Sequence, residues 1–112
     1  MEIDNNYVQQ LKEEDIKKFV SSLNVKLVDL YLNKDNYWVV ELIIKSKNKN
    51  GKEILAEMPV VYILTDKGVE QGYTLLPQLQ KNYLPIITKQ WKAFLSATAS
   101  TNTETTNTPS IN

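Results

Sequence analysis

The stretch from Tyr37 to Lys47 constrains the fold most strongly, because it alternates with the two-residue period of a β-strand. Its even positions are all apolar: Trp38, Val40, Leu42 and Ile44. Its odd positions include Glu41 and Lys45, so the pattern predicts one face on a core and one face half exposed. A sheet with one dry face needs helices to cover that face.

Three further segments have strand character. Asn48–Gly51 ends in Asn-Gly and predicts a hairpin, since this pair tolerates the positive φ angles of a type I′ turn. Pro59 cannot donate to a ladder, so it predicts a bulge or a sheet edge within the strand that contains it. The expected strands besides Tyr37–Lys47 are Val25–Leu32, Lys52–Thr65 and a weaker Val69–Leu76.

Helical periodicity flanks these strands on both sides. An apolar stripe predicts a helix over residues 13–23, preceded by a short turn of helix near Tyr7; the stripe is Ile16, Phe19, Val20 and Leu23. From Pro77 onward, apolar residues again recur every three or four positions. This part predicts a short turn over residues 77–83 and a main helix over about 85–97, with Pro85 in its first turn.

These elements predict a single α+β domain over residues 1–98. The expected order is an N-terminal helix, a meander of about four antiparallel strands and a C-terminal helix. Residues 99–112 are rich in Ser, Thr and Asn with almost no apolar content, so we expect a disordered C-terminal tail there.

The composition argues against an enzyme. The chain has no Cys, His or Arg, which removes thiolate and imidazole chemistry and most transition-metal ligands. The acids Glu13, Glu14 and Asp15 suit the start of a helix, and no motif for a nucleophile or a phosphate loop is present. Asp29 and Glu41 can lie on one face of neighbouring strands, but we expect no catalytic residues, no cofactor and no metal site.

Protein association is the leading functional hypothesis, either as a homodimer or with another protein. The last helix carries more apolar surface than a thin sheet requires, and its expected interface residues are Trp91, Phe94, Ile87 and Leu95. Trp91 can instead close the core beside Trp38. The first strand and the strand with Pro59 are potential sheet edges, and either could pair with a partner strand.

Binding of single-stranded nucleic acid is the alternative. Lysines gather at the expected hairpin tip, and tyrosines on the sheet can stack on bases; the candidate residues are Lys45, Lys47, Lys49, Lys52, Tyr37 and Tyr31. A sheet meander followed by a helix resembles, in the order of elements, the small whirly-like single-strand DNA-binding modules and transcriptional coactivators. Against this alternative, the 13 basic residues are balanced by 13 acids.

The location and source are inferred from composition alone. The first residues are acidic and polar, unlike a secretory signal, and the apolar runs are too short to span a bilayer. We therefore expect a cytoplasmic protein with no membrane contact. Richness in Lys, Asn and Ile without Arg fits an AT-rich coding sequence, as in many viruses and plasmids.

Overall fold

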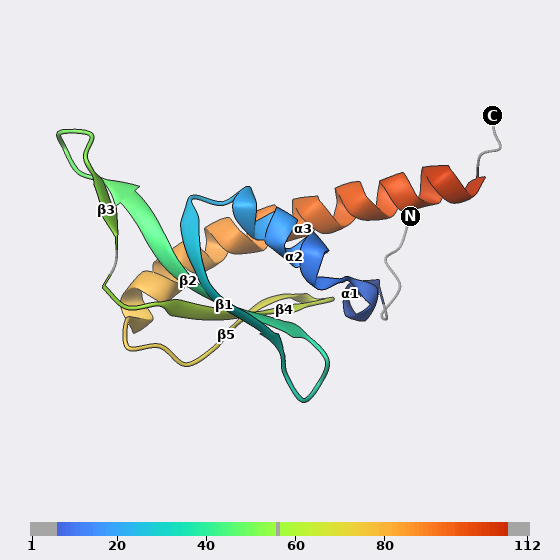
Figure 1. Ribbon diagram of the computed structural model, residues 1–112, viewed down its shortest axis with the longest axis horizontal. Coiled ribbons are helices and arrows are strands. Elements are labelled where there is room, and N and C mark those ends of the chain that lie inside the picture. The colour runs from blue at the N-terminus through green and yellow to red at the C-terminus, as the bar shows by residue number, and fades with distance from the viewer. Residues whose placement is uncertain (1–6, 56, 108–112) are drawn as a thin grey trace.

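The computed structural model describes residues 7–55 and 57–107 and has α+β architecture. The expected order of elements is confirmed: helix, antiparallel strands, helix (Figure 1). In chain order the elements are α1 (Tyr7–Gln10), α2 (Glu13–Ser21), β1 (Val25–Leu32), β2 (Trp38–Lys47), β3 (Glu53–Leu55), β4 (Val60–Thr65), β5 (Gly68–Gln71) and α3 (Pro77–Asn107).

The sheet is an antiparallel meander in the order β1-β2-β4-β5, and β3 pairs only with the far end of β2. The strand expected over Lys52–Thr65 is thus divided into β3 and β4. Pro59 lies directly before β4, where its missing N–H costs the ladder nothing. Of the two alternatives at Pro59, a bulge or a sheet edge, the edge is excluded for β4, because β4 lies between β2 and β5. β1 is an edge, as expected.

All the helices pack on the same face of the sheet (Figure 1). The even positions of β2 point into this core, as the alternation predicts, with Val40 and Leu42 fully buried. They meet Ile16 and Phe19 of α2 on one side and Ile87 of α3 on the other. The opposite face of the sheet therefore has no helix over it in the part of the chain that the structure describes.

Trp91 lies at the centre of the core. Its side chain is fully buried, its ring meets Phe19 edge-on with the centroids 5.0 Å apart, and its indole N–H donates to the carbonyl of Thr65 at 2.9 Å. Ile87 and Leu95 are also buried, and the half-buried Phe94 stacks on Trp91. The structure places three of the expected interface residues, Trp91, Ile87 and Leu95, in the monomer's own core, and the half-buried Phe94 packs against that core. Trp91 closes the core, which was the alternative prediction for this residue.

α3 is one continuous helix, although a break before Pro85 was expected. Pro85 removes one backbone hydrogen bond, but its ring faces solvent, and core contacts on both sides hold the helix together, at Gln80 and at Ile87. α3 continues to Asn107 and extends beyond the sheet (Figure 1), so it passes the expected tail boundary at residue 99. Residues 108–112 of that expected tail lie outside the described residues. Among the described helices, none has the length and apolar character needed to cross a bilayer.

Replacing Trp91 with Ala should destabilise the monomer, because it removes a fully buried aromatic ring and leaves a cavity. We expect the free energy of unfolding in urea to fall by roughly 3–5 kcal/mol. Replacing the exposed Gln90 with Ala is the matched control and should change the free energy of unfolding by less than about 0.5 kcal/mol. Unchanged stability of the Trp91 variant would contradict the assignment of this residue to the core.

Candidate functional site

The lysine hairpin is the first sequence-predicted site. Its turn is held by Asn48, whose carbonyl accepts the N–H of Gly51 and whose side-chain oxygen accepts the N–H groups of Asn50 and Lys52. Gly51 has a φ of 81°, but Asn50 has a negative φ, so the turn is not the expected type I′. A type I turn followed by a left-handed glycine fits this geometry.

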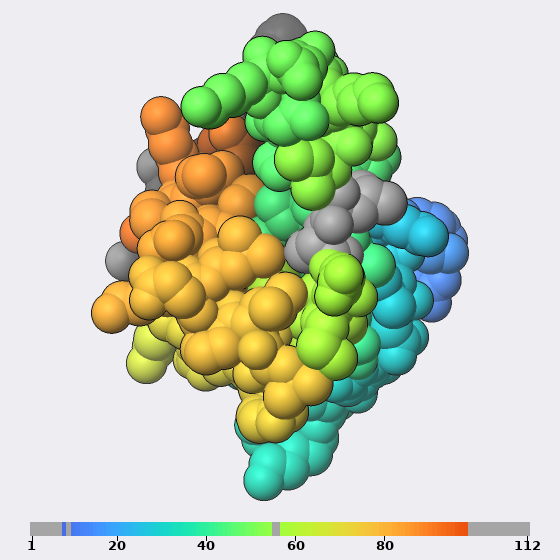
Figure 2. All heavy atoms as spheres, turned by 90° about the vertical axis from the view of Figure 1, so that its left-hand side faces the viewer, coloured from blue at the N-terminus to red at the C-terminus, as the bar shows by residue number. Residues whose placement is uncertain are grey.

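The hairpin stands away from the body of the molecule (Figures 1 and 2). Lys47, Lys49 and Lys52 are exposed and Lys45 is half-buried, so the structure brings the four predicted lysines together at one end of the sheet. The nearest acid is Glu53, which lies directly opposite Lys47 across the hairpin. This end of the molecule is therefore basic.

The two predicted tyrosines lie at the other end of the sheet. Tyr31 is opposite Val39, and Val39 is about 27 Å from Lys47 at ~3.4 Å per residue along β2. The hydroxyl of Tyr37 donates to Asp66 at 2.8 Å, and this bond raises the pKa of Tyr37. The structure thus separates the tyrosines from the lysines.

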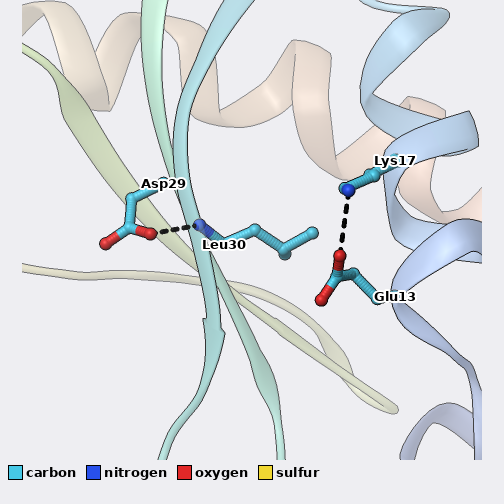
Figure 3. A network of polar contacts seen from close by, with 4 residues as sticks. All are labelled: Glu13, Lys17, Asp29 and Leu30. Carbon is cyan, nitrogen blue, oxygen red and sulfur yellow. Dashed lines mark hydrogen bonds and ion pairs between the residues drawn. The ribbon is translucent and has the colours of Figure 1, made fainter.

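Two carboxylates lie between these ends. Asp29 and Glu41 are directly opposite each other on β1 and β2, on the face that no helix covers. A bulge in β1 precedes Asp29, whose carboxylate accepts the N–H of Leu30 at 2.8 Å (Figure 3). Figure 3 also shows the Leu30 side chain pointing toward α2 and that of Asp29 pointing away from it. The bulge and the carboxylate together protect the β1 edge from pairing.

The acids of α2 serve the helix itself. Glu13 pairs with Lys17 at 2.9 Å (Figure 3), and this contact raises the pKa of Lys17. Asp15 accepts the backbone N–H of Lys12 at 2.8 Å, as a residue in the first turn of a helix commonly does. Within residues 7–55 and 57–107, no three acidic side chains gather closely enough to hold a metal ion.

A hollow of about 250 Å³ adjoins Glu41 on the uncovered face. We call it the Glu41 hollow; its lining residues are Glu41, Met58, Pro59, Val61, Tyr73, Thr74 and Leu75. Three apolar side chains at its rim are exposed to solvent: Tyr73 is 81% exposed, Leu75 57% and Met58 39%. The two segments that form its walls lie side by side in Figure 2, in yellow-green and gold.

Buried polar contacts position the outer wall of this hollow. The side chain of Gln80, which is 1% exposed, accepts the N–H of Val61 and donates to the carbonyl of Gly72 at 2.6 Å. The hydroxyl of Thr74 donates to the carbonyl of Pro59 at 3.0 Å. These bonds fix the loop of residues 72–76 against the start of β4, so the exposed Tyr73 is held on a rigid base.

The sequence analysis missed this hollow because it expected a strand over Val69–Leu76. β5 ends at Gln71. The N–H of Gly72 still donates to the carbonyl of Val61 on β4 at 2.8 Å, but the carbonyl of Gly72 accepts from the Gln80 amide, and the chain then leaves the sheet. The available signal was Gly72 itself. A Cβ there would lie 2.6 Å from Cγ1 of Val61, so only glycine allows this close approach.

No protein-family model, curated protein or solved structure matches this chain. The function is therefore argued from the geometry of the uncovered face and the hairpin.

Replacing Gly72 with Ala should lower the free energy of unfolding by about 1–3 kcal/mol, because the added methyl group collides with Val61. Adding Val61→Ala removes the colliding Cγ1, so the double variant should lose less stability than the sum of the two single variants. Urea denaturation of all four proteins in the cycle measures this coupling. Strict additivity would contradict the tight contact between Gly72 and Val61.

Proposed function

We propose that this chain is a non-enzymatic protein-association module, with the uncovered face of its sheet as the contact surface. The observation that carries the proposal is the Glu41 hollow, whose rim exposes Met58, Tyr73 and Leu75 beside an acidic residue. Exposed apolar side chains that adjoin one another and have a polar border mark interaction sites more often than chance exposure does.

The composition and rigidity of this surface support the proposal. Tyrosine and methionine are enriched at protein interfaces, where they supply apolar area with a polar or polarisable group. The Gln80 and Thr74 contacts hold the rim in place, so binding need not order a mobile loop. The α3 residues first expected at an interface are in the core, so the association hypothesis now relies on the sheet.

A photo-crosslinking amino acid at position 73 tests the proposal in the cells that make the protein. We expect a covalent protein adduct, because the Tyr73 side chain lies at the rim of the contact surface. The same group at the exposed Lys89 of α3 is the control and should give none. Adding Leu75→Asp should abolish the adduct at position 73, since a buried, unpaired charge is costly at an interface.

The mass of the adduct identifies the partner as a second copy or as another protein. Either result supports the proposal if Leu75→Asp removes it. Absence of an adduct at position 73, or equal adducts at 73 and 89, would contradict the proposal.

Single-stranded nucleic acid is the second candidate, supported by the four lysines of the exposed hairpin. The acidic pair Asp29 and Glu41 weakens this candidate, because a strand that runs from the hairpin to Tyr31 would cross two carboxylates.

For this reason we expect no binding of a labelled single-stranded oligonucleotide at physiological salt, measured by fluorescence anisotropy. Binding that weakens steeply with salt, and that is lost on replacing Lys45, Lys47 and Lys49 together with Glu, would establish the second candidate instead. A melting curve of the triple variant controls for its folding.

A further inference from the structure

The lysine hairpin has no packing partner within the part of the chain that the structure describes. Every residue from Ser46 to Ile54 is exposed, and the large apolar side chain of Ile54 is 46% exposed. A two-stranded ribbon without a hydrophobic contact is at best marginally stable in water. The hairpin is therefore an arm, residues 46–54, whose side chains are free to contact a surface outside its own monomer.

No lysine is among the described residues that line the Glu41 hollow, and Lys26, opposite Ile43 on the same face, forms no ion pair with Glu41. Glu41 is half-buried and has neither a hydrogen bond nor an ion pair among the described residues, and the like charge of Asp29 lies directly opposite. Like charges opposite each other on a sheet are destabilising, and a cation placed between them relieves this. At about 250 Å³ the hollow is below the ~300–1,000 Å³ of drug-sized ligand sites, so it suits a single side chain.

The arm and the hollow are related by simple geometry. Glu41 and Lys47 are on the same face of β2 by the alternation of the strand, six residues and thus about 20 Å apart. Consider a two-fold axis that lies above the uncovered face, midway between Glu41 and Lys47, parallel to the sheet and perpendicular to β2. Rotation about this axis generates a second copy whose uncovered face is opposite that of the first. Lys47 of each copy then lies over Glu41 of the other, so one rotation satisfies both contacts.

We propose that the occupant of the uncovered face is a second copy of this chain, in a two-fold dimer that exchanges lysine hairpins. The inference rests on the proposed function and names its partner. Charge complementarity carries it: the exposed arm, residues 46–54, has three lysines and one acid, the centre of the face has Asp29 and Glu41 with no ion pair to either among the described residues, and the whole chain has a net charge of zero. Such a self-complementary surface closes with two-fold symmetry, the commonest symmetry of oligomers.

Charge reversal at the two positions tests the dimer. By sedimentation velocity we expect Lys47→Glu alone and Glu41→Lys alone each to raise the dimer dissociation constant at least about ten-fold, since each turns two attractive pairs into repulsive ones. An equimolar mixture of the two variants should restore a mixed dimer, because every Glu41–Lys47 contact in it joins opposite charges again. Lys89→Glu makes the same charge change on exposed α3 and should leave the dissociation constant unchanged.

The mixture also controls for folding, since a misfolded variant cannot restore a dimer. A further variant, Glu41→Gln, removes the charge without reversing it and should weaken the dimer less than Glu41→Lys does. A wild-type chain that stays monomeric at millimolar concentration would overturn the inference. So would a dimer that is indifferent to both reversals, or single variants whose mixture stays monomeric. A position-73 adduct with a different protein, alongside a monomeric wild type, would overturn this inference and leave the proposed function standing.

Discussion

The burial of Trp91 is the interaction on which the rest of the structure depends. Its ring contacts Phe19 of α2 and Phe94 of α3, and its indole N–H bonds to Thr65 at the end of β4, so one side chain joins both helices to the sheet. Because α2 and α3 meet at this ring, they lie on the same face of the sheet. The opposite face is left without a helical cover, and the candidate site lies there.

A second, polar constraint shapes that uncovered face. Gln80 is buried among apolar side chains, so its amide must find partners, and it finds them on Val61 and Gly72. Gly72 keeps one backbone bond to Val61 of β4 and gives its carbonyl to the Gln80 amide, and the chain then turns outward at Tyr73. The Glu41 hollow is thus a consequence of how a buried amide is satisfied at the edge of the core, and the same contacts make it rigid.

The sequence predicted the helices and strands better than it predicted which of their side chains lie in the core and which line a surface. The alternation of Tyr37–Lys47 identified the core face of β2, and Val25–Leu32 matches β1, because a two-residue period leaves few other ways to bury one face. Trp91 was assigned to an interface because its helical stripe is the same whether the partner is the chain's own sheet or another molecule. The hollow was missed because it needs the Gly72 turn, which local strand propensity does not indicate.

The sequence by itself determined the fold class, the position of the lysine hairpin and the absence of Cys, His and Arg, since periodicity, turn residues and composition are local properties. Only the tertiary structure decided which apolar residues are core and which are surface. It also decided that Asp29 faces Glu41, since strand register depends on pairing between distant segments and on a bulge. The candidate site comes from segments that meet only in the folded chain, so it is a product of packing.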